Sequence, residues 1–445
     1  MILDKWIREK IKVNKELTRE NLDKYQLTTL NNLIKYAKEN SKFYEKLYKD
    51  IDEINSLDEL YKIPTINKED IIENGNKMVC VNQSEISRIV SINTSGTMGS
   101  HKRIFFTEED QNLTVDFFVH GLSFLVSKND TMMIMMPCKT ENSVGDLIRK
   151  ALTIMGVNPV LNGTLMSFKE TTDLMIKNKV NSIVGMPVEI LALGRYIKHE
   201  NLPIKIKSIL LSADMVNQVL IEEIKQTYNC EVYNHFGMTE TGLGGAVECE
   251  YHNGMHIREN DLLIEIVNPI TKEKVENGES GEILVTTLTR KAMPLIRYET
   301  GDIASFVKGD CSCKSVLKRL DNIKYRMDDR VNIGKNIYIN ISMVDSILFK
   351  LENLINYKIE VENCDTYYEL QLQLAFLDED DKKDNTNYNE ELKNKIKTLL
   401  LENSRIRKSY EMGMLNFAIE LTYTKEYINF YKGKRKIIST EKIKV

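Results

Sequence analysis

Apolar and polar positions along the chain predict a helical start followed by a long region of alternating strands and helices. Between Asn21 and Asp50, apolar residues recur at helical spacing with charged residues between them. These apolar positions are Leu27, Leu30, Leu33, Ile34, Ala37 and Tyr44. Further along, the β-branched run IVSIN at 89–93 predicts a strand that leads into a turn containing two glycines.

Strand-like runs then alternate with longer amphipathic stretches. The runs lie at 131–137, 181–186, 208–212 and 231–234. Strands that alternate with helices predict a layered α/β architecture. From Leu262 to Leu288 the chain changes to strands separated by turn residues, so we expect an antiparallel or β-barrel-like part there.

A polar junction, RMDDR at 326–330, separates this region from a further mixed segment with a charged turn at 378–385. A chain of 445 residues exceeds the length at which a single core keeps growing, so we expect more than one domain. We place the boundary at the junction. This predicts a large N-terminal domain over 1–325 and a smaller C-terminal domain over 326–445.

Composition and charge exclude several classes of protein. Hydrophobic residues make up 42% and charged residues 28% of the chain, which is ordinary for a protein with a buried core. The 61 basic and 65 acidic residues are mixed, so no surface for nucleic acid is indicated. No window has about 18 uncharged apolar residues and the N-terminus lacks the continuous apolar stretch that is typical of a signal peptide, so we expect a cytoplasmic protein without a membrane span. The oligomeric state stays open, a homodimer included.

The glycine-containing turn reads TSGTMGSHK at 94–102. Its backbone N–H groups could surround phosphate oxygens, with the glycines permitting close approach and Lys102 adding positive charge. The same residues are also compatible with an ordinary turn. The spacing differs from the P-loop of GTPases and kinases, so that class is not indicated.

Three motifs resemble those of the adenylate-forming superfamily, which contains acyl-CoA synthetases, luciferases and peptide-synthetase adenylation domains. The turn at 94–102 is similar to its Thr-Ser-Gly-Thr-Thr-Gly-x-x-Lys phosphate loop, with Met98 in place of the second threonine of the Thr-Thr pair. YNHFGMTE at 233–240 resembles the aromatic-Gly-x-Thr-Glu motif, and YETGD at 298–302 resembles the Tyr-Arg-Thr-Gly-Asp motif. Three matches in the expected order make coincidence improbable.

Within the superfamily, the chain resembles phenylacetate-CoA ligases and their relatives. GEILVTTLTR at 281–290 and PLIRY at 294–298 are similar to signatures of that branch, as are Phe43-Tyr44 and IPTINK at 63–68. The resemblance covers nearly the whole chain. It implies an α/β fold with a multi-subdomain adenylation domain, which combines layered α/β sheets with the β-barrel-like part, and a small, mobile α+β C-terminal domain.

The resemblance also implies roles for individual residues. Glu240 would bind magnesium, Lys102 would lie at the phosphates, and Asp302 would accept hydrogen bonds from the ribose hydroxyls. His235, Phe236 and Gly237 would line the adenine and acyl pockets. The remaining candidate residues for nucleotide binding are Thr94, Ser95, Gly96, Thr97, Gly99 and Thr239.

Two further matches lie in the C-terminal domain. YRMDD at 325–329 resembles the superfamily's Gly-Arg-x-Asp-Asp hinge, which makes Arg326 and Asp328 candidates although Tyr325 replaces the glycine. Gly433-Lys434 resembles the motif whose lysine bridges the carboxylate and the α-phosphate, so Lys434 is a candidate catalytic residue. The Pro-Arg that precedes this motif is missing, and Lys432 and Lys436 remain alternatives. A solvated lysine-rich tail is the other interpretation.

Cysteines and histidines suggest a zinc site. The seven cysteines show no disulfide framework, but CSC at 311–313 and CEYH at 249–252 offer thiolates and an imidazole. In relatives that carry such cysteines, the resemblance implies a structural zinc between these two loops. The preferred ligands are Cys249, His252, Cys311 and Cys313, with His256 as the alternative fourth ligand. Reduced cysteines without a metal are the competing interpretation.

The function that these residues imply is an ATP-dependent, AMP-forming acid–CoA ligase. Its cofactors and substrates would be ATP, magnesium, CoA and a carboxylic acid, with an aryl acid favoured by family analogy alone. A second hypothesis replaces CoA by a protein thiol, a carrier protein or an amine. A third is a non-catalytic, nucleotide-binding regulator. The presence of Lys102, Glu240, Asp302 and a terminal lysine argues against the regulator, which would not need all of them.

Overall fold

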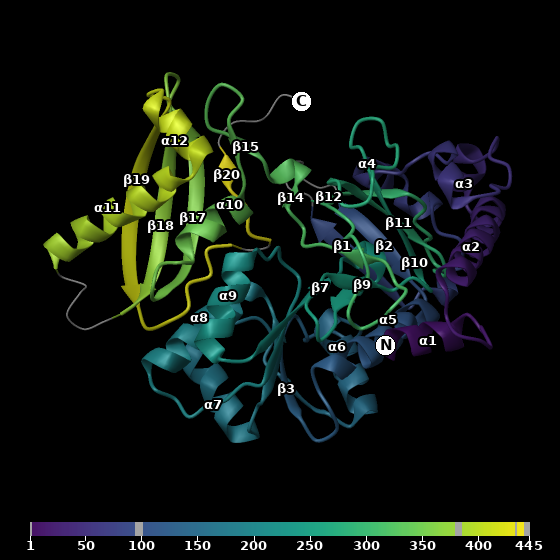
Figure 1. Cartoon of the computed structure of the whole chain (residues 1–445), viewed down its shortest axis with the longest axis horizontal. Coiled ribbons are helices and arrows are strands. Elements are labelled where there is room, and N and C mark those ends of the chain that lie inside the picture. The colour runs from purple at the N-terminus through teal and green to yellow at the C-terminus, as the bar shows by residue number, and fades with distance from the viewer. Residues whose placement is uncertain (1, 94–100, 379–384, 432–433, 440–445) are drawn as a thin grey trace. The chain divides into compact units, whose positions relative to one another are not determined.

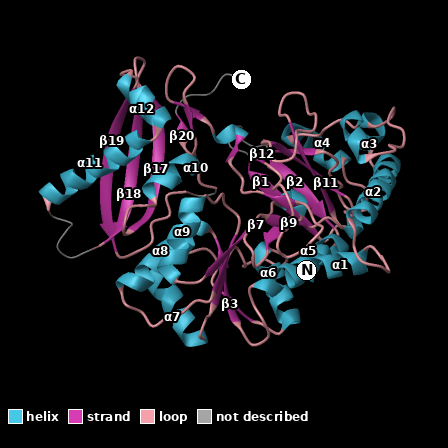
Figure 2. Ribbon diagram, in the orientation of Figure 1, coloured by secondary structure: helices cyan, strands magenta, loops and turns pink. Residues whose placement is uncertain are grey.

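The structure is a computed structural model that describes residues 2–93, 101–378, 385–431 and 434–439. The chain forms two compact units. Unit 1 comprises Met1–Asn129, Pro137–Asn158 and Tyr233–Ile323, and unit 2 comprises Asp130–Met136, Pro159–Val232 and Lys324–Val445. Helices and strands are mixed in both (Figure 2), which confirms the predicted α/β class. The boundary between 325 and 326 stays a prediction, because unit 2 also contains 159–232.

The helices of unit 1 begin with the segment that the sequence predicts as helical. Thr18 caps α2 through a capping box with Asn21, and Ser41 both ends α2 and caps the next helix. The apolar side of α2 is buried, as the spacing of its leucines requires. The helices are α1 (Ile2–Lys10), α2 (Arg19–Asn40), α3 (Lys42–Leu47), α4 (Lys68–Asn74), α5 (Glu108–Gly121) and α6 (Val144–Met155).

The strands of unit 1 form antiparallel groups (Figure 1). The hairpin β1–β2 flanks the glycine-containing turn, and Asn93 of β1 lies opposite His101 of β2. The order β10-β11-β12 is an antiparallel meander, as expected for the region after Leu262. Another group has the order β13-β9-β8-β7. The bounds are β1 (Arg88–Asn93), β2 (His101–Phe106), β7 (Glu231–Phe236), β8 (Ala246–Glu248), β9 (Met255–Ile257), β10 (Leu262–Val267), β11 (Gly281–Thr287), β12 (Tyr298–Ala304) and β13 (Arg319–Leu320).

Unit 2 contains the alternating strands and helices of the α/β region. Its strands follow the order β4-β3-β5-β6, and β5 pairs in parallel with both β3 and β6. Every residue of β3, β5 and β6 is buried, which explains their continuous apolar sequence. The elements are β3 (Thr131–Met135), β4 (Asn158–Leu161), α7 (Phe168–Asn178), β5 (Ser182–Gly185), α8 (Pro187–His199), β6 (Ser208–Leu211) and α9 (Gln218–Tyr228).

The C-terminal segment of unit 2 adds a mixed sheet of order β19-β18-β17-β20. The hairpin β17–β18 is antiparallel, whereas β19 and β20 each join it in parallel. Among the described residues, no helix combines the length and apolar composition that crossing a membrane requires. The elements are β14 (Tyr325–Arg326), β15 (Val331–Asn332), β16 (Tyr338–Ile339), α10 (Ile341–Leu348), β17 (Leu354–Asn363), β18 (Tyr368–Leu377), α11 (Thr386–Glu402), α12 (Ser404–Glu411), β19 (Leu415–Thr424) and β20 (Ile438–Ser439).

Candidate active site

Lys102 lies at the centre of the candidate site in unit 1. Exposed and buried side chains alternate at the start of β2, and the lysine is on the buried side. Its Nζ forms an ion pair with Glu240 and donates to the Tyr298 hydroxyl at 3.2 Å. The same Nζ lies 5.5 Å from the centre of the Tyr298 ring. The structure thus brings together one side chain from each of the three motifs.

Glu240 is carried by a turn that neighbouring elements hold in place. The turn contains the short 3₁₀ helix Thr239–Thr241, which directly follows β7 and Gly237-Met238. The carbonyl oxygens of Glu240, Thr241 and Gly242 each accept a hydrogen bond from a buried side chain. The respective donors are Arg290 at 2.7 Å, Arg258 at 3.1 Å and Thr114 at 2.6 Å. Three consecutive carbonyls are therefore fixed, and the side chain of Glu240 is only 4% exposed.

The residues before Glu240 are tightly packed. A Cβ atom on Gly237 would lie 2.2 Å from the Leu243 carbonyl oxygen, so only glycine fits this position. His235 packs against the rings of Phe117 and Phe118, each with its centre 6.2 Å away. Burial, with the charge of Arg258, lowers the pKa of His235 to about 4, so its ring is neutral at pH 7. Phe236 is buried as well, and Thr239 is half-buried.

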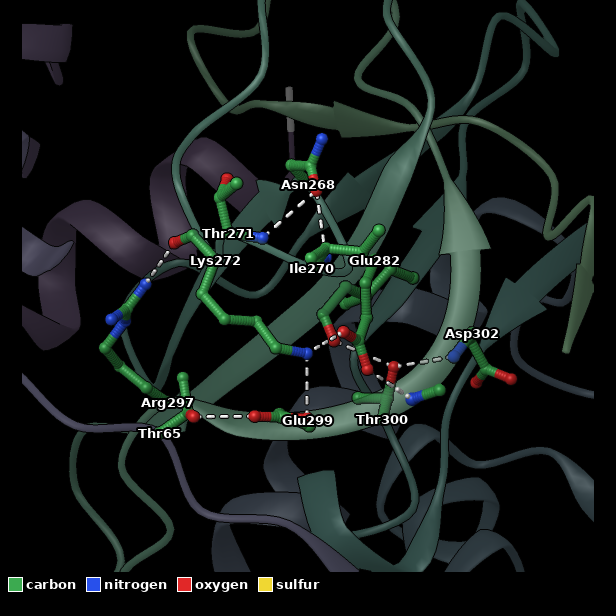
Figure 3. A network of polar contacts seen from close by, with 12 residues as sticks. Thr65, Asn268, Ile270, Thr271, Lys272, Glu282, Arg297, Glu299, Thr300 and Asp302 are labelled. Atoms are coloured by element: carbon green, nitrogen blue, oxygen red, sulfur yellow. Dashed lines mark hydrogen bonds and ion pairs between the residues drawn. The ribbon is translucent and has the colours of Figure 1, made fainter. Parts of the chain in front are cut away.

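Asp302 lies in a bulge of β12 (Figure 3). Glu282 of β11 pairs with Ile303 and Leu284 pairs with Glu299, so β12 has additional residues between these two pairs. Thr300 Oγ1 donates to the Ile283 carbonyl oxygen at 2.8 Å and accepts from the Asp302 N–H at 3.0 Å. A bulge of this kind changes the direction in which a side chain leaves the strand. Here it determines the orientation of Asp302.

Five predicted loop residues, Thr94, Ser95, Gly96, Thr97 and Gly99, lie outside the described residues. The strands on either side are described, and they end side by side at Asn93 and His101. Lys102, the last residue of the motif, is placed in the buried group with Glu240.

The candidate residues of the predicted C-terminal domain belong to unit 2. Arg326, in β14, is half-buried, and Asp328, in the 3₁₀ helix Met327–Asp329, is exposed. Lys434 is exposed, Lys436 is half-buried, and Lys432 lies outside the described residues. Arg435, directly after Lys434, is buried and makes two hydrogen bonds of 2.8 and 3.1 Å with the Asp345 carboxylate. The tail is therefore not simply solvated.

Cys249, His256, Cys311 and Cys313 form a cluster in unit 1. Their ligand atoms all lie within 4.8 Å of one another. Cys249 follows β8 and His256 lies in β9, so the β8–β9 hairpin supplies two of the four side chains. Burial, with the positive charge of Arg319, lowers the pKa of His256 to about 4, so the imidazole is in the neutral form that binds metals. Burial raises the pKa of the Cys249 thiol to about 12.

His252, the preferred fourth ligand from the sequence, is not part of this cluster. The backbone turns directly after Cys249: the His252 N–H donates to the Cys249 carbonyl at 3.0 Å, and His252 has a φ of +47°. The ring instead packs 4.7 Å from the Tyr233 ring centre, with Nδ1 3.3 Å from Glu248. The alternative ligand, His256, occupies the position because pairing of β8 with β9 brings it back beside Cys249.

Comparison with known proteins identifies the family. The family described as AMP-binding enzyme matches residues 20–289, which is more than half of the chain. The chain belongs to this family. A phenylacetate-coenzyme A ligase of Thermus thermophilus is 26% identical over 80% of the chain and 82% of its own length, and one of Pseudomonas putida is 24% identical over 81% and 85%. These similarities confirm the adenylate-forming superfamily and its phenylacetate-CoA ligase-like branch.

Solved structures support the fold of this AMP-binding enzyme. A 2-hydroxyisobutyryl-CoA ligase in the postadenylation state matches with a TM-score of 0.79, covering 95% of the chain and 90% of that structure at 18% identity. The same ligase in a thioesterification state matches with a TM-score of 0.66 at 19% identity. At these identities the likeness concerns the fold alone.

Several residues of the site were not singled out from the sequence. Arg258, Arg290 and Thr114 hold the Glu240 turn, and Tyr298 contacts Lys102. Arg290 and Tyr298 lie within the signature segments at 281–290 and 294–298, which was the available signal. Arg258 and Thr114 lie in no recognised motif, and only the fold brings them to the Glu240 turn.

Proposed function

We propose that this AMP-binding enzyme is an AMP-forming acid–CoA ligase. It uses ATP and magnesium to convert a carboxylic acid into an acyl adenylate, and then into a CoA thioester. One observation carries the proposal: the buried group of Lys102, Glu240 and Tyr298, which joins the three motifs in one place. Similarity to relatives named phenylacetate-coenzyme A ligase over 80% and 81% of the chain supports it.

In the first half-reaction, a carboxylate oxygen of the acid bonds to the α-phosphorus of ATP and pyrophosphate leaves. Bound magnesium would draw negative charge from the phosphates as the leaving group forms. Glu240 would hold this ion, Lys102 would contact the phosphates and Asp302 would accept hydrogen bonds from the ribose hydroxyls. Because Lys102 and Glu240 are almost fully buried, their charges act where water screens them little.

In the second half-reaction, the CoA thiolate attacks the acyl carbonyl carbon and AMP leaves with the electron pair. The proposal includes the domain division at 325/326, with Arg326 and Asp328 at the hinge and Lys434 acting in the first half-reaction. A protein thiol, a carrier protein or an amine in place of CoA is the alternative acceptor for this step.

The test is an acid-dependent exchange of labelled pyrophosphate into ATP, screened over aryl, short-chain and amino acids. We expect exchange with at least one class, and AMP release with that acid when CoA is added. AMP release with an amine or a carrier protein, but not with CoA, would replace the acceptor. No exchange with any acid would overturn the ligase and favour a nucleotide-binding regulator.

A structural zinc at Cys249, His256, Cys311 and Cys313 is the second part of the proposal. Three cysteine sulfurs and one imidazole are a donor set that zinc prefers in closed, four-coordinate sites, and binding of the ion would release the thiol protons. The contacts of 3.7 Å between the Cys249 and Cys311 sulfurs and 3.4 Å between Cys313 and His256 Nε2 support it. These residues would tie the β8–β9 hairpin to the segment at 311–313.

A further inference from the structure

A single lysine lies between two glutamates beside the bulge that carries Asp302 (Figure 3). Lys272 Nζ is 2.6 Å from Glu282 Oε2 and 2.8 Å from Glu299 Oε2. The Glu282 side chain is 3% exposed, and those of Glu299 and Lys272 are 21% and 24% exposed. Burial alone would lower the pKa of Lys272, but the hydrogen bonds to both glutamates outweigh it, so the pKa is raised.

Glu282 connects this lysine to the bulge. One carboxylate oxygen pairs with Lys272, and the other accepts from the Gly301 N–H at 3.2 Å. Gly301 immediately precedes Asp302 and has a φ of +73°, a conformation that favours glycine. The orientation of the Glu282 carboxylate therefore helps to fix the backbone from which Asp302 extends.

Glu299 is held from the other side. Its Oε1 accepts from the Thr65 hydroxyl at 2.6 Å, while its Oε2 contacts Lys272. Residues 298–302 resemble the Tyr-Arg-Thr-Gly-Asp motif, and Glu299 stands where that motif has an arginine. In this chain the positive charge comes instead from the turn between β10 and β11.

The turn holds Lys272 rigidly. Asn268 Oδ1 accepts from the N–H groups of Ile270 and Thr271 at 2.9 and 3.2 Å, and Lys272 adopts a φ of +58°. The Lys272 carbonyl accepts from Arg297 Nη2 at 3.1 Å. Arg297 is 2% exposed and is itself paired with Glu265. Lys272 is thus fixed at its backbone as well as at its ammonium group.

Removal of the ammonium group would leave two carboxylates close together without their common cation. For a carboxylate as buried as that of Glu282, an uncompensated charge is unfavourable, so it would turn away or take up a proton. Either response weakens the acceptor for the Gly301 N–H. The bulge would then populate other conformations.

We propose that Lys272 is a positioning residue for nucleotide binding. By bridging Glu282 and Glu299 it fixes the bulge at Thr300–Asp302, and so determines how well Asp302 holds the ribose hydroxyls. The inference rests on the proposed function, since the role of Asp302 belongs to it. In this proposal Lys272 acts through Glu282 and the bulge and not by direct contact with the nucleotide.

The experiment compares two ligands in Lys272→Met, which removes the charge but keeps an apolar stem. Titration calorimetry measures the Kd of AMP and of 2′,3′-dideoxy-AMP, which lacks both hydroxyls. We expect the preference of the wild type for AMP to fall about tenfold in the variant, the worth of a charge-assisted hydrogen bond, with the affinity for the dideoxy ligand unchanged. Lys274→Met is the control, because Lys274 is on the same turn but 66% exposed and paired with the exposed Asp58.

Two further variants complete the test. Lys272→Met combined with Glu299→Arg returns a cation beside Glu282 and should restore the preference. If Lys272→Met does not fold, the double variant Lys272→Met with Glu299→Gln removes the repulsion between the two carboxylates. Its preference for AMP over the dideoxy ligand should still fall about threefold, because Glu282 lacks its cation. An unchanged preference in the folded variants overturns the inference.

Failure of the proposed function has a different signature. A wild-type protein that binds AMP without preferring the hydroxyls would overturn the role of Asp302, and with it the role of Lys272. A wild-type protein that neither binds AMP nor exchanges pyrophosphate would overturn the ligase itself.

Discussion

Arg290 shows how a single buried residue can support Glu240 through the backbone of its turn. Its Nη1 donates to the Glu240 carbonyl oxygen at 2.7 Å, and its guanidinium carbon lies 4.8 Å from the centre of the Phe106 ring. Burial lowers the pKa of Arg290 to about 10, which still leaves it charged at pH 7. The planar guanidinium can donate and stack at once, which an ammonium group cannot.

Replacement of Arg290 by lysine should therefore loosen the Glu240 turn while keeping the charge. We expect Arg290→Lys to raise the KM for magnesium–ATP in pyrophosphate exchange by about tenfold, corresponding to one charged hydrogen bond. Arg149→Lys is the control, since Arg149 is 39% exposed and pairs with Asp146. A KM equal to that of the wild type would show that Arg290 does not position Glu240.

Glu189 predicts a pH dependence of stability in unit 2. It lies in the first turn of α8, where Oε2 accepts from the Leu165 N–H at 2.8 Å. Burial raises its pKa from 4.5 to about 7. Between these two values the folded state binds more protons than the unfolded state. The contribution of Glu189 to stability is therefore lost as pH rises through this window.

Glu189→Gln should remove this dependence, because glutamine keeps an acceptor for Leu165 but has no charge. Above pH 7 we expect the variant to be more stable than the wild type by about 2–3 kcal/mol, and the difference should shrink toward pH 5. Urea unfolding over this pH range measures it, with Glu222→Gln as a control at an exposed position of α9. A stability difference between the variant and the wild type that does not vary with pH would contradict the raised pKa of Glu189.

At the level of single residues, the sequence predicted candidate residues that lie in contiguous motifs and missed those that lie outside them. The sequence predicted Lys102 and Glu240 because each lies in a recognisable run. It favoured His252 over His256 as the fourth zinc ligand, because the position of His256 beside the cysteines depends on how β8 pairs with β9. It gave no sign of Lys272, whose two partners lie on other strands.

At the level of elements, local periodicity predicted the existence of strands and helices but not their pairing. The expected strands at 131–137, 181–186 and 208–212 correspond to β3, β5 and β6, and the helical segment after Asn21 lies in α2 and α3. The bulge in β12 was not predicted, because it arises from the register between β11 and β12. Register is a relation between strands, and a single strand's sequence does not contain it.

The β8–β9 hairpin supplies two of the four proposed zinc ligands, Cys249 and His256. If His256 is a ligand, protein purified without a histidine tag should contain about one equivalent of zinc, and His256→Ala should lose it and unfold at a lower temperature. His252→Ala should retain the metal, since His252 faces Glu248 and Tyr233. Metal analysis decides this, and zinc below about a tenth of an equivalent in the wild type would exclude the site.

At the level of the whole molecule, unit 2 joins the C-terminal segment to the parallel sheet. Arg195 of α8 donates to the carbonyl oxygens of Leu354 and Phe349 at 2.5 and 2.6 Å, so the C-terminal sheet is anchored to this helix. A movement of 326–445 about the proposed hinge would have to break these contacts. Length and motifs predicted more than one domain, but they could not predict that α8 contacts the C-terminal segment, because these hydrogen bonds join residues far apart in the sequence.

Two neighbouring residues of the C-terminal tail, Lys434 and Arg435, lie in different surroundings and should differ in their effects on catalysis and stability. Lys434 is exposed, whereas its neighbour Arg435 is buried against Asp345 with its guanidinium carbon 4.9 Å from the Tyr357 ring centre. Arg435→Met should therefore lower stability by about 3–5 kcal/mol, the usual effect of breaking a buried pair. Lys434→Ala should leave unfolding unchanged.

In catalysis, Lys434→Ala should abolish formation of the acyl adenylate yet spare thioester formation from supplied adenylate, because its charge is needed only while pyrophosphate leaves. Separate assays of the two half-reactions measure this. Lys436→Ala is the matched control, and a selective loss there would transfer the role to Lys436. Equal loss of both half-reactions in Lys434→Ala would remove Lys434 from the role, since a lysine that stabilises only the first transition state cannot affect the second.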